Sequence, residues 1–174
     1  MDLIKSIRDS IRAIPDYPKP GITFRDISPL LQSKDAFKST IEAFAQRYQE
    51  LGIDQIAAVE ARGFIFGAAV ADRLGAGFVP IRKPNKLPST TIQTSYELEY
   101  GEGSLEIHDD AIDKGQKVLI VDDLLATGGT AQAAVQLIKK LGGIVQGVVF
   151  LIELEGLKGR SKLLDENIVS ILKY

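Results

Sequence analysis

The chain has 174 residues, 45% of them hydrophobic and 25% charged, and a formal net charge of −2 at pH 7. This length and composition predict one globular domain with a sizeable core and exclude a disordered chain, and the weak negative charge argues against non-specific binding to nucleic acid or anionic membranes. With no cysteine and one histidine, disulfides, thiolate metal sites, a Cys nucleophile and a multi-His metal site are excluded.

The opening segment predicts one helix followed by an irregular loop. Four isoleucines lie on one stripe of that helix before Pro15 ends it: Ile4, Ile7, Ile11 and Ile14. The next stretch, PDYPKPGITFRD, contains three prolines and a glycine, so we expect an ordered loop without regular structure. A second helix is expected from Lys34 to Leu51, where Gly52 ends it.

Beyond residue 54, short apolar runs alternate with helical patterns. The predicted strands are 55–60, 77–81, 117–123, 147–153 and 168–172. One helix is expected from about Gly63 to Leu74, and another follows residue 123 and closes at Gly142. Strands this apolar, alternating with helices, predict an α/β fold with a mostly parallel central sheet flanked by helices.

The pattern is interrupted between residues 89 and 108. Two polar runs there, TTIQTSYELEY and GSLEIH, predict a two-stranded excursion around Gly101 and Gly103. Because it is polar and glycine-tipped, we expect it to be mobile.

The strongest chemical signal is the stretch VLIVDDLLATGGTA, from Val118 to Ala131. An apolar strand ends in two carboxylates, Asp122 and Asp123, and a short loop then enters a helix. The loop consists of Ala126, Thr127, Gly128, Gly129 and Thr130. Its glycines, hydroxyls and helix N-terminus suit a phosphate, while the carboxylates suit ribose hydroxyls or a bound Mg²⁺. Together they predict a site for a ribose 5-phosphate.

This stretch resembles the phosphoribosyl pyrophosphate signature of the type I phosphoribosyltransferases. Further motifs are similar to the adenine-specific members of that family: PDYPKPGITFRDISPLL, EARGFIFG, IRKPNKLP and SYELEYGEGSLEIHDDAI. The resemblance implies transfer of a phosphoribosyl group from phosphoribosyl pyrophosphate to adenine, giving AMP and pyrophosphate, with Mg²⁺. It also implies one domain over 1–174, with a hood at about 1–34, a core at about 35–174 and a flexible loop at about 89–108.

The resemblance assigns the remaining site residues. Pyrophosphate would lie on cations that follow the first two predicted strands, namely Arg62, Arg82, Lys83 and Lys86. The peptide geometry near Arg62 would be unusual, and Ala61 stands where many members have Ser, which puts a hydroxyl contact to pyrophosphate in doubt. Adenine would contact Thr23, Phe24, Arg25 and Leu124.

In the family the excursion closes over the substrates, which implies catalytic roles for Glu99 and Tyr100 beside Asp122 and Asp123. We choose Glu99 to handle the adenine proton, but on the residues alone Glu97, Glu102 and Glu106 are equal candidates, as acids of a solvated hairpin.

Three other functions stay open: transfer to a different purine, a non-enzymatic regulator that binds phosphoribosyl pyrophosphate, and a plain nucleotide-binding module. The hood sequence favours adenine, and the net charge of −2 disfavours a nucleic-acid-binding regulator. We expect a homodimer in the cytoplasm, with no secretory signal and no membrane-spanning helix.

Overall fold

The computed structural model describes residues 3–97 and 101–174. The chain forms two compact units, Met1–Ala43 and Phe44–Tyr174, and each is described by itself. In the part of the chain that is described, no helix combines the length and the apolar character that crossing a membrane requires.

The N-terminal unit contains a small antiparallel hairpin and short helices. Its elements are α1 (Leu3–Asp9), β1 (Arg12–Ile14), β2 (Phe24–Asp26), α2 (Ser28–Gln32) and most of α3 (Lys34–Ala45). In the hairpin, Ala13 pairs with Arg25 and Ile14 with Phe24. The rings of Tyr17 and Phe24 meet edge to face at 5.3 Å.

Two predictions for this unit are wrong. The opening helix ends at Asp9 rather than near Pro15, because Ser10 and Ile11 donate to carbonyls only three residues back and the chain then enters β1. The stretch predicted to be irregular ends in the strand β2, since all its prolines precede Phe24 and leave the N–H groups of β2 in place.

Helix α3 ends at Ala45, six residues before the predicted end at Leu51. The N–H of Tyr48 donates to the carbonyl of Ala45 at 2.9 Å, and turns follow. The buried Tyr48 ring then lies over Gly147, where an added Cβ would be 2.4 Å from the Tyr48 hydroxyl. The predicted helix end was wrong because helical periodicity gives no information about this tertiary contact.

The C-terminal unit is built on a five-stranded parallel sheet in the order β4-β3-β7-β8-β9. Its strands are β3 (Gln55–Val59), β4 (Gly77–Ile81), β7 (Lys117–Leu125), β8 (Ile144–Glu153) and β9 (Ile168–Lys173). All five predicted strands are therefore present, and the predicted α/β fold with helices flanking the sheet is confirmed.

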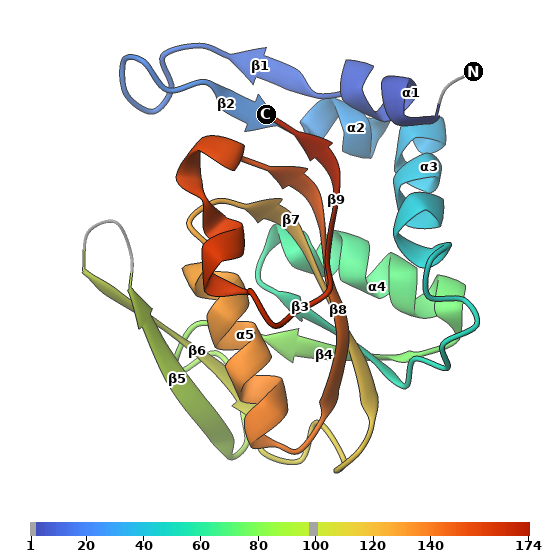
Figure 1. The fold of residues 1–174 in the computed structure, drawn as a ribbon, viewed down its shortest axis with the longest axis vertical. Coiled ribbons are helices and arrows are strands. Elements are labelled where there is room, and N and C mark those ends of the chain that lie inside the picture. The colour runs from blue at the N-terminus through green and yellow to red at the C-terminus, as the bar shows by residue number, and fades with distance from the viewer. Residues whose placement is uncertain (1–2, 98–100) are drawn as a thin grey trace. The chain divides into compact units, whose positions relative to one another are not determined.

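Helices cover both faces of this sheet (Figure 1). Helix α4 (Arg62–Leu74) packs on β3 and β7, where an added Cβ on Gly67 would lie 2.6 Å from the Cβ of Ala58. The neighbouring Ala57 belongs instead to the core cluster formed with α5 (Gly129–Lys140). Successive strand residues thus face opposite helices, which explains why the strands are apolar throughout.

The predicted excursion is the antiparallel hairpin of β5 (Thr91–Glu97) and β6 (Glu102–His108). Helix α5 lies between this hairpin and the sheet (Figure 1). The hydroxyl of Thr94 donates to the side chain of Gln136 on α5 at 3.0 Å. The last connection, between β8 and β9, contains two short 3₁₀ helices, η1 (Glu155–Leu157) and η2 (Gly159–Lys162).

Candidate active site

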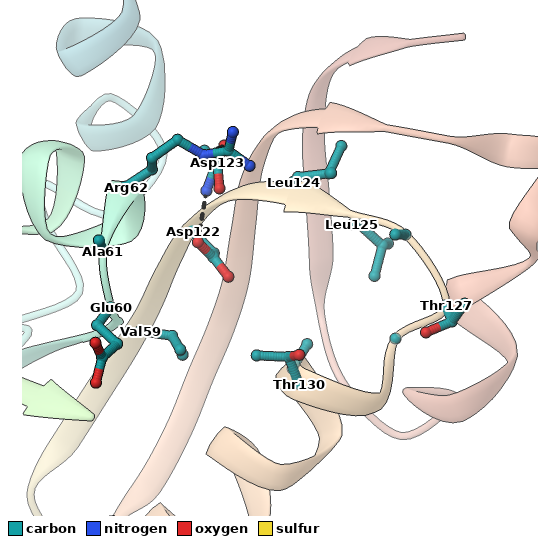
Figure 2. Close-up of a pocket in the computed structure, with 13 residues that line it drawn as sticks. Val59, Glu60, Ala61, Arg62, Asp122, Asp123, Leu124, Leu125, Thr127 and Thr130 are labelled. Carbon is teal, nitrogen blue, oxygen red and sulfur yellow. Dashed lines mark hydrogen bonds and ion pairs between the residues drawn. The ribbon is translucent and has the colours of Figure 1, made fainter. Parts of the chain in front are cut away.

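A cavity of about 420 Å³ opens at the carboxyl ends of β3 and β7. This is where parallel α/β sheets bind ligands. Its lining comes from the end of β3, the start of α4, the end of β7 and the loop into α5 (Figure 2). The lining residues are Val59, Glu60, Ala61, Arg62, Asp122, Asp123, Leu124, Leu125, Ala126, Thr127, Gly128, Thr130 and Ala131.

The loop 126–130 is the part of the lining that suits a phosphate. Gly128 has φ of 82° and directly precedes α5, so the loop turns through a conformation that glycine adopts at little cost. The N–H groups of the first helical turn have no acceptor within the helix, and the helix dipole favours an anion there. Thr127 and Thr130 add hydroxyls to the same cavity (Figure 2).

The loop is supported from behind by η2, a contact that the sequence did not predict. An added Cβ on Gly128 would lie 2.3 Å from the carbonyl oxygen of Gly159, and one on Gly159 would lie 2.3 Å from that of Ala126. Arg160 anchors this segment through two bonds to the Glu153 carboxylate, at 2.6 and 2.8 Å. The shape of the phosphate loop therefore depends on packing against a segment about thirty residues later.

The two adjacent aspartates differ in their surroundings. Asp122 accepts the N–H of Asp123 at 2.8 Å, and Asp123 forms an ion pair with Arg62 at 2.7 Å (Figure 2). Burial raises the pKa of Asp122 well above its usual range, and the Asp123 charge raises it further. Burial also raises the pKa of Asp123, but the Arg62 guanidinium opposes that rise. Perturbed carboxyl groups in a cavity are typical of functional sites.

Asp122 reaches its place because Gly63, in the first turn of α4, has no side chain. An added Cβ on Gly63 would lie 2.8 Å from Oδ1 of Asp122. One residue before Arg62, the structure has a cis peptide bond between Glu60 and Ala61. The unusual geometry expected near Arg62 thus lies at the Glu60–Ala61 bond.

The other three predicted cations lie on the turn after β4 and are not among the residues that line the cavity. Glu60 connects this turn to the cavity, since its Oε1 pairs with Arg82 at 3.3 Å and accepts the N–H of Lys83 at 2.8 Å. Burial alone would raise the pKa of Glu60, but the Lys83 N–H and the Arg82 charge stabilise the carboxylate and hold this pKa below its usual value. The side chains of Lys83 and Lys86 are exposed.

The residues predicted to bind adenine fall in different units. Leu124 lines the cavity in the C-terminal unit, half-buried at the end of β7. Thr23, Phe24 and Arg25 belong to the N-terminal unit, where Thr23 is exposed and Phe24 is half-buried. Their role in binding adenine stays a prediction.

Glu99 and Tyr100, the residues predicted to act from the excursion, lie outside the described residues. The described end of β5 reaches the phosphate loop, since an added Cβ on Gly129 would lie 2.8 Å from the carbonyl oxygen of Glu97. Of the alternative acids, Glu97 and Glu102 are exposed. Glu106 is buried and accepts several hydrogen bonds, so its description as an acid of a solvated hairpin is wrong.

Comparison with known proteins identifies the family. The model of the phosphoribosyl transferase domain matches residues 26–172. An adenine phosphoribosyltransferase of Thermoanaerobacter sp. (strain X514) is 55% identical over 171 residues, which cover 98% of this chain and 99% of that protein. One of Acidobacterium capsulatum is 51% identical over 168 residues, covering 97% and 93%.

Solved structures agree with this. The adenine phosphoribosyltransferase of Thermoanaerobacter pseudethanolicus has a TM-score of 0.94 and 54% identity, covering 98% of this chain and 99% of that one. That of Saccharomyces cerevisiae, in complex with adenine and an imino-altritol bisphosphate, has a TM-score of 0.93 and 39% identity over 98% of both chains. The fold, the phosphate loop and these likenesses together place this chain in the adenine phosphoribosyltransferase family.

Proposed function

We propose that the protein transfers the 5-phosphoribosyl group from phosphoribosyl pyrophosphate to adenine, yielding AMP and pyrophosphate. The observation that carries this proposal is the joint placement of the loop 126–130 and the pair Asp122–Asp123 in one cavity, beside Arg62. A phosphate loop, carboxylates and a cation fit the three parts of this substrate: its 5-phosphate, its ribose hydroxyls and its pyrophosphate.

In the proposed complex, the 5-phosphate is bound by the loop residues Ala126, Thr127, Gly128, Gly129 and Thr130. Asp122 and Asp123 accept hydrogen bonds from the ribose hydroxyls. This fixes C1′ relative to the base and the leaving group, and positioning of this kind removes much of the entropic barrier.

The pyrophosphate lies on the cations Arg62, Arg82, Lys83 and Lys86. The guanidinium groups bind oxygens in pairs, while the exposed Lys83 and Lys86 ammonium groups provide compact charges. These cations stabilise the additional negative charge that builds up on the pyrophosphate oxygen as the C1′–O bond breaks.

Mg²⁺ is the proposed cofactor. Among the described residues, no group of three or more metal-ligating side chains gathers around one point. Mg²⁺ prefers few protein carboxylates and several substrate oxygens, and Asp122 and Asp123 in the cavity fit that preference. When bound with pyrophosphate, the ion neutralises the charge of the leaving group.

The family resemblance supports adenine contacts with Thr23, Phe24, Arg25 and Leu124. N9 of the base attacks C1′, the bond from C1′ to the pyrophosphate oxygen breaks, and the proton of the base passes to Glu99. Closure of the loop with Glu99 and Tyr100 excludes water, which otherwise competes for the cationic sugar. A buried acceptor facing position six would disfavour purines that carry a carbonyl there.

We also propose that the protein is a homodimer and works in the cytoplasm. The family resemblance supports the dimer. A chain without cysteine is compatible with the reducing cytoplasm.

The function is tested by incubating the protein with Mg²⁺, phosphoribosyl pyrophosphate and one purine base at a time, and identifying the nucleotide by mass. AMP is expected with adenine. Nucleotide formed only from guanine, hypoxanthine or xanthine would favour another base specificity, and no nucleotide from any base would favour a regulator or a plain nucleotide-binding protein.

A further inference from the structure

Glu106 on β6 is one of the few charged side chains buried in the described part of the chain, with 2% of its surface exposed. Its Oε1 accepts the N–H groups of Lys86 and Leu87, both at 3.0 Å. Its Oε2 accepts from the Gln93 side chain at 3.3 Å and the Thr91 hydroxyl at 3.5 Å. The carboxylate therefore lies at the centre of a built network rather than on a solvated surface.

The backbone of Glu106 is joined to the same turn. Its N–H donates to the carbonyl of Arg82 at 2.7 Å, and the N–H of Arg82 donates back to its carbonyl at 3.0 Å. Within the turn, the Arg82 guanidinium donates to the carbonyl of Lys86 at 3.3 Å. The segment 82–87 is thus bonded to Glu106 at both ends.

The charge state of Glu106 agrees with this network. Burial opposes ionisation, but the N–H groups of Lys86 and Leu87 hold the pKa of Glu106 below its usual value. Donors reach both oxygens of Glu106, and they favour the carboxylate because a charged acceptor forms stronger hydrogen bonds than a neutral one.

The turn held in this way carries the three cations Arg82, Lys83 and Lys86. Glu60 holds its other side through Arg82 and the Lys83 N–H. With Glu60 at the end of β3 and Glu106 on β6, two carboxylates fix the backbone from which the exposed Lys83 and Lys86 side chains extend.

We propose that Glu106 is a positioning residue for pyrophosphate. It orders the turn 82–87 in the free protein, so that the cations of this turn contact the pyrophosphate without prior rearrangement of the backbone. This inference rests on the proposed function, in which those cations bind the leaving group. A site ordered in advance binds more tightly because binding no longer bears the cost of ordering the loop. The effect should be smaller at the loop 126–130, because Gly128 of that loop packs against η2 rather than against the turn 82–87.

Calorimetry with two ligands tests the proposal. Glu106→Ala removes the acceptor, and affinity for magnesium pyrophosphate should fall about tenfold or more, as expected when buried donors lose a charged partner. Affinity for ribose 5-phosphate should stay within about twofold, since Gly128 of its loop packs on η2 and not on the turn 82–87. Glu106→Gln keeps one oxygen for both N–H groups and should retain most of the affinity for pyrophosphate.

Asp109→Ala is the matched control, because Asp109 is an exposed acid just beyond β6 that bonds Thr90 and not the turn. It should bind both ligands as the wild type does. If Glu106→Ala does not fold, Glu106→Asp replaces it, since the shorter carboxylate cannot reach the turn and should also weaken pyrophosphate binding selectively.

Three outcomes are decisive. Selective loss of pyrophosphate binding in Glu106→Ala or Glu106→Asp, with recovery in Glu106→Gln, supports the proposal. A folded variant that binds pyrophosphate normally, or that loses both ligands equally, overturns it while the proposed function stands. A wild-type protein that binds neither ligand overturns the proposed function and this inference with it.

Discussion

Gly128 and Gly159 are in direct backbone contact, so that an added Cβ on Gly128 would lie 2.3 Å from the carbonyl oxygen of Gly159. Gly128 belongs to the phosphate loop and Gly159 to η2, in the connection between β8 and β9. The loop that we propose for the 5-phosphate therefore depends on a segment that carries no recognisable motif.

Gly159→Ala should displace the phosphate loop, because its Cβ would lie 2.3 Å from the carbonyl oxygen of Ala126. We expect a loss of about 1–3 kcal/mol in the free energy of unfolding, the usual cost of overpacking. Calorimetry should show weaker binding of ribose 5-phosphate. Gly156→Ala is the control, since an added Cβ there has no neighbour within 4 Å. Equal behaviour of the two variants would show that η2 does not support the loop.

Asp122→Asn should abolish most of the activity and yet stabilise the protein at neutral pH. Burial raises the folded-state pKa of Asp122, so the folded protein holds this proton more tightly than the unfolded chain does. The stability contributed by the protonated form is present at low pH and is lost as pH rises from the unfolded to the folded pKa. Asparagine does not titrate, and its oxygen can still accept the N–H of Asp123.

Thermal unfolding of this variant over a range of pH checks the sign. At neutral pH we expect Tm to rise by about 2–4 °C, which corresponds to about 1 kcal/mol for a chain of this size. The gain should disappear below the ordinary pKa of aspartate. Asp113→Asn, at an exposed position, should show no such difference. A Tm gain that does not depend on pH would contradict the assignment of the buried charge.

Arg62→Ala should weaken binding of phosphoribosyl pyrophosphate about 10- to 100-fold, as loss of a charged hydrogen-bond donor permits. Stability at neutral pH should fall as well, because the Asp123 side chain is only 10% exposed and its carboxylate would lose its ion-pair partner. Arg73→Ala, in the last turn of the same helix, is the control for the loss of one positive charge. Binding and melting curves for both variants separate the two effects, and normal binding by Arg62→Ala would remove it from the pyrophosphate site.

Glu99→Ala and Thr127→Ala should fail in different ways. If Glu99 acts only in the closed transition state, its removal should lower kcat and kcat/KM by the same factor, equivalent to a loss of about 2–4 kcal/mol of transition-state stabilisation. Binding of phosphoribosyl pyrophosphate without adenine should be unchanged. Thr127→Ala should mainly weaken that binding and have a smaller effect at saturation. A normal kcat in Glu99→Ala would mean that another acid of the hairpin handles the proton, and Glu102 would be the next candidate.

The sheet and the phosphate loop could be predicted because their signals are local. Five apolar runs mark the strands, and the carboxylates and glycines of the site follow one another between Asp122 and Thr130. The predictions that failed depend on contacts distant in the sequence. Helix α3 ends early where Tyr48 packs over Gly147, and Ile14 enters a strand because it pairs with Phe24.

Glu106 shows why the network around the turn could not be predicted. Between Leu105 and Ile107, strand alternation assigns it to the opposite face, which in most antiparallel hairpins is exposed to solvent. Here that face is covered by a turn about twenty residues earlier, and the N–H groups of Lys86 and Leu87 belong to the backbone. Backbone donors leave no trace in residue identity, so neither periodicity nor a motif indicates them.

Competition between bases tests the central claim most directly. Adenine, hypoxanthine and guanine are supplied at equal concentration with Mg²⁺ and phosphoribosyl pyrophosphate, and the early ratio of the nucleotides formed gives the ratio of their kcat/KM values. AMP should exceed IMP and GMP by at least about a hundredfold, as polar mismatch in a buried site permits. GMP or IMP in amounts comparable to AMP would contradict the assignment to adenine.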